Sequence, residues 1–197
     1  MIIKGLFFII IGFLLGGIMF CALLPKILFK TDVTQNSLDK NPGAFNVFSN
    51  CGAIKGLFCL FFDIFKGFLP VFISKFFIPT NHFIFAFIML APVLGHASGI
   101  FNDFKGGKCI ATSFGVLLGI LPVSFIGFLL ALIYILSLLL FKSNALKSLF
   151  SFSAFGFGAF IICIFSNRFY IGLGCVLISV TAIIKHRLKD KEIVNAG

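Results

Sequence analysis

Residues Gly95–Thr112, with the sequence GHASGIFNDFKGGKCIAT, combine a glycine pair with basic side chains between two apolar runs. The pair Gly106–Gly107 allows a tight turn in which backbone N–H groups approach a ligand closely, and Lys108 adds a positive charge. If the apolar segment from Cys109 is a helix, its positive N-terminal end faces the same place. This pattern predicts a phosphate site. It is not a Walker A loop, because Asn102 replaces a required glycine and Cys109 replaces the magnesium-binding Ser/Thr.

The elements that position this segment are predicted to be membrane helices. The 197 residues are 60% hydrophobic, with a mean hydropathy of +1.16, whereas a soluble domain rarely exceeds about half apolar residues. We therefore expect an all-α, polytopic membrane helix bundle that forms a single domain over residues 1–197. The six cysteines form no CxxC pair, and most lie in apolar runs as small hydrophobic residues. We predict no metal and no cofactor.

The formal charge of +10 indicates anionic partners, either lipid headgroups or phosphorylated substrates. The basic residues lie between apolar runs and form no basic domain, which excludes a nucleic-acid partner. Lys185 begins a strongly basic tail, so the C-terminus is predicted to be cytoplasmic and, with an odd number of spans, the N-terminus outside. Seven spans are expected, the first ended by Pro25: Gly5–Leu24, Ala53–Ser74, Phe83–Phe101, Cys109–Leu121, Val123–Phe141, Ser148–Phe165 and Phe169–Ile184.

This topology places four polar stretches on the cytoplasmic face: Lys26–Gly52, Asn102–Lys108, Lys142–Lys147 and the tail from Lys185. Within them, the Asn-Pro-Gly and Gly-Gly-Lys turns offer backbone donors of the kind that form anion-binding nests.

Asp63 and Lys66 lie inside the second predicted span. A charge at mid-membrane costs roughly 2.5–3.5 kcal/mol on insertion scales, and the i,i+3 spacing allows the two side chains to pair. The sequence leaves two interpretations open: a structural ion pair between helices, or the lining of a polar cavity.

Five stretches, in order along nearly the whole chain, resemble the acyl-phosphate:glycerol-3-phosphate acyltransferases of the PlsY type. The family motif GSGNxGATN is similar to LDKNPGAFN at Leu38–Asn46, and its DxxKG matches Asp63–Gly67. The central motif GHxFPxFxxFKGGKGVAT closely matches Gly95–Thr112. The SLSS motif is reduced to Ala145–Ser148, and the terminal HRxN becomes HRLK at His186–Lys189.

The resemblance implies an enzyme of the bacterial cytoplasmic membrane that catalyses the first step of phospholipid synthesis. It transfers a fatty acyl group from acyl phosphate to the 1-hydroxyl of glycerol 3-phosphate, giving 1-acylglycerol 3-phosphate (lysophosphatidate) and phosphate. The donor is already activated, so neither a covalent nucleophile nor a metal is needed, and the donor's own phosphate accepts the proton. The protein mainly holds two phosphates with the hydroxyl close to the carbonyl.

The resemblance also implies residue roles. Lys108, Ser148 and His186 are the expected catalytic residues, and His96, at a helix end, is expected to make structural hydrogen bonds. The expected substrate-binding residues are Asn41, Gly43 and Asn46 at the donor, Gly106 and Gly107 in the phosphate loop, and Lys40 and Lys189.

The chain departs from the family motifs at Asp39, Lys40, Phe45, Ser49, Cys109, Ala145 and Lys189. Ser49 stands where the family has an arginine that binds phosphate as a bidentate fork. Lys40 and Lys189 are expected to restore that charge as flexible point charges. Other interpretations are a paralogue that acylates a different phosphorylated acceptor, a small organic-anion transporter, or a non-catalytic lipid-binding bundle. The sequence leaves acyl-chain length and oligomeric state open.

Overall fold

The computed structural model describes residues 1–35, 37 and 41–194, with side chains up to Leu188. Within this part the chain is helical and contains no strand, as the sequence predicts. Its helices are α1 (Ile2–Gly17), α2 (Phe20–Leu28), α3 (Ala44–Cys51), α4 (Ala53–Ser74), α5 (Phe83–Ser98), α6 (Ile110–Gly119), α7 (Gly127–Leu140), α8 (Asn144–Phe165) and α9 (Phe169–Val194).

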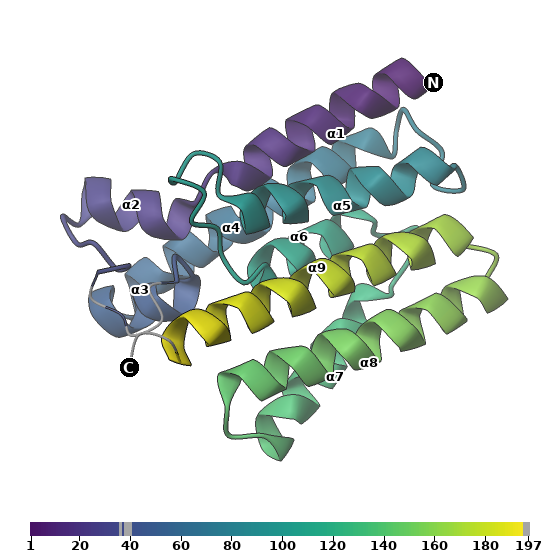
Figure 1. Cartoon of the computed structure of the whole chain (residues 1–197). Helices are drawn as coiled ribbons and strands as arrows, with labels where there is room; N and C mark the ends of the chain where they lie inside the picture. Colours follow the sequence, from purple (N-terminus) through teal and green to yellow (C-terminus); the bar gives the residue numbers. More distant parts are fainter. Residues whose placement is uncertain (36, 38–40, 195–197) are drawn as a thin grey trace.

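The two ends of the bundle differ in their content (Figure 1). One end carries the N-terminus, the α4–α5 connection and the α8–α9 turn. The other carries α2, α3, the α5–α6 and α7–α8 connections, and the C-terminal part of α9. We call the second the loop end. The described parts of the four polar stretches that the sequence analysis placed on one face lie there.

Three helices are long and apolar enough to cross a membrane by themselves: α4, α8 and α9 as far as Leu188. The pair α1–α2 qualifies as a fourth span, although its two parts are bent by 46°. Shorter apolar helices, α5, α6 and α7, occupy the places of the other three predicted spans. The outward side chains are largely phenylalanine, leucine and isoleucine, as expected of helices that face lipid.

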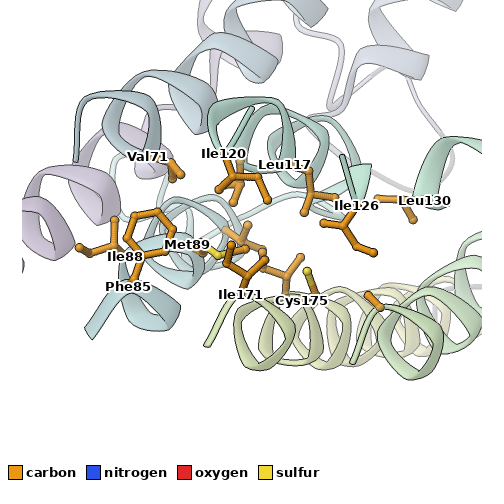
Figure 2. Close-up of a cluster of buried hydrophobic side chains, with 14 of the residues drawn as sticks. Val71, Phe85, Ile88, Met89, Leu117, Ile120, Ile126, Leu130, Ile171 and Cys175 are labelled. Atoms are coloured by element: carbon orange, nitrogen blue, oxygen red, sulfur yellow. The ribbon is translucent and has the colours of Figure 1, made fainter. Parts of the chain in front are cut away.

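The main core lies between the helices α4 to α9 (Figure 2), and its labelled members are Val71, Phe85, Ile88, Met89, Leu117, Ile120, Ile126, Leu130, Ile171 and Cys175. Glycines let the helices approach closely. A Cβ at Gly95 would lie 2.0 Å from the Phe13 carbonyl oxygen, and one at Gly115 would lie 2.0 Å from the Ile64 carbonyl oxygen. Small residues at such contacts are typical of membrane helix packing.

A second, smaller cluster lies at the loop end and contains Cys21, Val33, Val47 and Cys59. These residues come from α2, the segment after it, α3 and α4. This cluster connects the first three elements of the loop end to the long helix α4.

The structure corrects several predicted boundaries. The first span is not one straight helix ended by Pro25: it breaks at Ile18, and Pro25 lies inside α2. The helix of the third predicted span, α5, ends at Ser98 rather than Phe101. The last two helices are longer than predicted, because α8 starts at Asn144 and α9 continues to Val194. The stretch predicted as polar loop, Lys26–Gly52, contains the end of α2 and all of α3.

Candidate active site

The connection from α5 to α6 folds back onto the last turn of α5. Gly99 ends α5 in the left-handed conformation, with φ of 61°. The Gly107 amide then donates to the His96 carbonyl oxygen at 3.1 Å. A Cβ at Gly106 would lie 2.0 Å from the carbonyl oxygen of Ala97. The glycine pair is therefore packed against helix backbone, and a side chain at Gly106 would push the loop away from α5.

Gly107 lies against the buried imidazole of His96. A Cβ on Gly107 would lie 2.3 Å from His96 Nε2. The sequence analysis assigned the glycine amides to a ligand, whereas the amide of Gly107 bonds within the protein. His96 Nδ1 has no hydrogen-bond partner among the described residues. The His96 side chain thus supports the loop by packing against Gly107, and the backbone carbonyl of His96 accepts the hydrogen bond from the loop.

The residue after Lys108 starts the next helix. Cys109 is buried and adopts φ of 66°, the left-handed region that glycine enters without steric cost, and α6 begins at Ile110.

Lys108 lies close enough to His186 of α9 to act on it electrostatically. His186 is only 2% exposed, and neither ring nitrogen has a hydrogen-bond partner among the described residues. A buried imidazole without protein partners is the kind of group that a polar ligand completes. Lys185, the preceding residue, acts in the same way on His96 and Cys109. The sequence analysis named Lys185 only as part of the basic tail.

Ser148 is buried near the start of α8. Helices α8 and α9 are antiparallel (Figure 1), and a Cβ at Gly156 would lie 2.9 Å from the Ser179 side chain. Ser148 lies about two helical turns before Gly156 on α8, and His186 lies about two turns after Ser179 on α9. Because the two helices are antiparallel, Ser148 and His186 lie at the same level, toward the loop end. The structure thereby places Lys108, Ser148 and His186 at one end of the bundle, from three separate elements.

The Asn-Pro-Gly turn leads directly into α3. Asn41 and Asn46 are both buried, and Asn46 Nδ2 donates to the Asn41 carbonyl oxygen at 2.7 Å. The Gly43 amide also donates to that oxygen, at 2.8 Å, and a Cβ on Gly43 would lie 2.6 Å from Asn41 Nδ2. The turn is therefore a compact unit at the loop end, the same end as His186. Lys40 and Asp39 lie outside the described residues, as does the side chain of Lys189.

Asp63 and Lys66 form the ion pair that their spacing allows, with Nζ and Oδ1 2.7 Å apart and both side chains buried. Lys66 Nζ also donates to the Ile18 carbonyl oxygen at 2.6 Å. Of the two interpretations left open by the sequence, these contacts favour the structural one, although the ion pair lies within α4 and only the bond from Lys66 to Ile18 joins two helices.

Comparison with known proteins identifies the family. A family model described as "Glycerol-3-phosphate acyltransferase" matches residues 6–196. The chain belongs to the glycerol-3-phosphate acyltransferase family. A family member from Macrococcus caseolyticus is 32% identical, over 95% of this chain and 92% of its own length. Another, from Hydrogenobaculum sp., is 38% identical, over 61% of each chain.

The fold of the family is also shared with a solved structure. The crystal structure of PlsY, an integral membrane glycerol 3-phosphate acyltransferase in its glycerol 3-phosphate form, superposes with a TM-score of 0.80 at 27% identity. The superposition covers 98% of this chain and 92% of PlsY. The chain is accordingly a membrane glycerol-3-phosphate acyltransferase, an enzyme of phospholipid synthesis.

Two of the departures from the family motifs, Phe45 and Ser49, lie in α3. Ser49 is exposed, and its hydroxyl donates to the carbonyl oxygen of Phe45 within α3 at 3.1 Å. Phe45, where the family motif has threonine, is 67% exposed. Neither residue carries a positive charge, so neither supplies the guanidinium fork of the family motif.

Proposed function

We propose that the acyl donor is an acyl phosphate and that the reaction takes place at the loop end, beside Lys108 and His186. The observation that carries this proposal is the placement of Lys108 near a buried imidazole whose two nitrogens have no hydrogen-bond partner among the described residues. A phosphate group between them would receive a charged hydrogen bond from each side.

The proposed chemistry needs positioning rather than a covalent intermediate. The C1 hydroxyl oxygen of glycerol 3-phosphate attacks the acyl carbonyl carbon, and the bond from that carbon to the phosphate oxygen breaks. Inorganic phosphate leaves and takes the hydroxyl proton, giving 1-acylglycerol 3-phosphate. Lys108 stabilises the charge on the phosphate, and Ser148 and His186 orient the reacting groups.

The two substrates are assigned to different parts of the loop end. Asn41, Gly43 and Asn46 form the turn that would shape the donor site. The acceptor site lacks the family arginine, and Lys40 and Lys189 are proposed to bind the glycerol 3-phosphate phosphate instead. As point charges they would hold it less rigidly than a guanidinium fork. This predicts a high acceptor KM that Ser49→Arg lowers.

We further propose seven membrane crossings, with the loop end in the cytoplasm. The distribution of basic residues supports this orientation, because cytoplasmic loops carry an excess of lysine and arginine. The opposite end has Lys4, Lys75 and Arg168, whereas the loop end has Lys26, Lys30, Lys55, Lys105, Lys108, Lys142, Lys147, Lys185 and Arg187.

The donor is tested by giving the purified protein palmitoyl phosphate or palmitoyl-CoA, each with glycerol 3-phosphate. The expected result is lysophosphatidate and an equal amount of phosphate from palmitoyl phosphate, and none from palmitoyl-CoA. If lysophosphatidate forms with palmitoyl-CoA and not with palmitoyl phosphate, the proposed donor is wrong.

A further inference from the structure

The break between α1 and α2 is held by a lysine from another helix. Ile18 ends α1 with an extended backbone, at ψ of 115°, so the helix does not continue into α2. Lys66, in α4, donates from Nζ to the Ile18 carbonyl oxygen at 2.6 Å. The same ammonium lies 5.8 Å from the centre of the Phe20 ring, within the range of a cation–π contact. Lys66 therefore contacts the residues on both sides of the break.

The position of Lys66 requires its own counter-charge. Lys66 is 2% exposed, and an isolated ammonium at such a site is strongly unfavourable. Asp63, one turn earlier on α4, supplies that charge at 2.7 Å. The pair can thus hold a charged donor inside the bundle, where it adds a second hydrogen bond to the Ile18 carbonyl oxygen, which also accepts from the Phe20 amide at 3.2 Å.

The angle of the break decides where α2 lies, and α2 is connected to the Asn-Pro-Gly turn. Beyond the break α2 departs from α1 by 46°. Cys21 of α2 then packs with Val47 of α3 and Cys59 of α4 in the smaller cluster. Helix α3 begins at Ala44, directly after the turn Asn41–Gly43. A change in the direction of α2 would therefore be transmitted through this cluster to the turn.

We propose that Lys66 is a positioning residue for the acyl-donor site. It fixes the α1–α2 angle and, through the smaller cluster, the Asn41–Asn46 turn. The proposal rests on the assignment of that turn to the donor. It predicts that loss of the Lys66 contacts raises the donor KM and leaves the acceptor KM unchanged.

Two variants of the ion pair separate the hydrogen bond from Lys66 to Ile18 from the charge of Asp63. Asp63→Asn keeps an N–H donor at position 66, because even a neutral amine can donate to the Ile18 carbonyl. The double variant Asp63→Asn/Lys66→Met removes the donor without leaving a buried carboxylate unpaired. Lys75→Met is the matched control: Lys75 follows the other end of α4, and its Nζ donates to the Leu121 carbonyl oxygen.

Two measurements on these variants test the proposal. In the double variant, hydrogen exchange is expected to quicken in Phe20–Leu28 and Ala44–Cys51, and the palmitoyl phosphate KM to rise on the order of tenfold, the size of one lost charged hydrogen bond. Lys75→Met is expected to leave both quantities near the unmodified values, and Asp63→Asn, which keeps a donor at position 66, to change them less than the double variant does. Unchanged exchange in the double variant, or an acceptor KM that rises equally, would overturn the proposal. If the unmodified protein does not use palmitoyl phosphate, the proposed donor is wrong, and the exchange result still decides whether Lys66 holds α2.

Discussion

The lack of a side chain at Gly107 is what allows the buried His96 ring to lie against the α5–α6 loop. In Gly107→Ala the new Cβ would lie 2.3 Å from His96 Nε2, so the ring or the loop must move. We expect the free energy of unfolding to fall by about 1–3 kcal/mol, as for other overpacked sites, and acyl transfer to fall about tenfold or more through misplacement of Lys108. Thermal unfolding and steady-state kinetics measure the two effects.

A second glycine provides the control for this substitution. In Gly158→Ala the Cβ meets Leu129 at 3.5 Å, an ordinary contact, and the helix gains intrinsic stability. This variant should keep full activity and unfold at an equal or higher temperature. Full activity in Gly107→Ala would contradict the role assigned to the contact with His96.

The charge of Lys108 is predicted to matter for turnover and not for folding. Lys108 is half-buried beside His186, where a charged hydrogen bond to phosphate is worth roughly 1.5–3 kcal/mol. Lys108→Ala is therefore expected to reduce kcat/KM about tenfold or more with little change in the melting temperature. Lys147→Ala, on α8 at the same end, removes an equal charge and should leave kcat/KM within about twofold. Equal losses in both variants would mean that only the net charge of the loop end matters.

At the scale of elements, the turn before α3 is predicted to depend on one buried amide. Asn46 is 6% exposed, and its Nδ2 donates to the Asn41 carbonyl oxygen. Asn46→Ala leaves this carbonyl with one donor fewer, so we expect a loss of about 1–3 kcal/mol in stability and a higher donor KM. Asn50→Ala removes a similar amide bond one turn later, to the Asn46 carbonyl, on an exposed residue. A donor KM that rises equally in both variants would argue against a special role for the turn.

The break between α1 and α2 follows a glycine pair, Gly16–Gly17, which is a weak helix former, but the sequence alone does not fix its angle. The residue that the sequence analysis took as the end of the span, Pro25, lies within α2 instead. The Ile18 carbonyl accepts locally from the Phe20 amide and finds a second donor in Lys66, 48 positions further along the chain. The ion pair Asp63–Lys66 was predictable, because i,i+3 side chains share a helix face. The hydrogen bond from Lys66 to the Ile18 carbonyl was not predictable, because it depends on how α1 packs on α4.

For the molecule as a whole, apolar runs and turn residues were enough to predict an all-helical chain with its polar stretches at one end. The glycine pair and Lys108 were recognised from their types and spacing. Their partners in the fold were not, since Gly107 lies against His96 of α5 and Lys108 acts electrostatically on His186 of the distant helix α9. Composition also set no exact number of crossings: among the described residues, α4, α8 and α9 are long and apolar enough to cross a membrane, and the bent pair α1–α2 is a fourth if it forms one span.

Topology can be tested with two serines that flank α8, because cysteine replaces serine with little change in size. Ser143 precedes α8 at the loop end and Ser166 follows it at the opposite end, and both are exposed. The native cysteines interfere little: Cys21, Cys59, Cys109, Cys163 and Cys175 are buried and only Cys51 is partly accessible. A Cys51→Ser background therefore leaves the introduced thiol as the reactive one.

In this background, a membrane-impermeant maleimide added to intact cells should label Ser166→Cys, and should label Ser143→Cys only after the membrane is opened. Lys105→Cys, in the α5–α6 connection, should behave like Ser143→Cys, because α6 and α7 together cross twice and return the chain to the same side. Ser143 and Ser166 labelled from one side would show that α8 does not cross. Lys105 and Ser143 labelled from opposite sides would show that α6 and α7 make a single crossing, and the chain would then cross six times rather than seven.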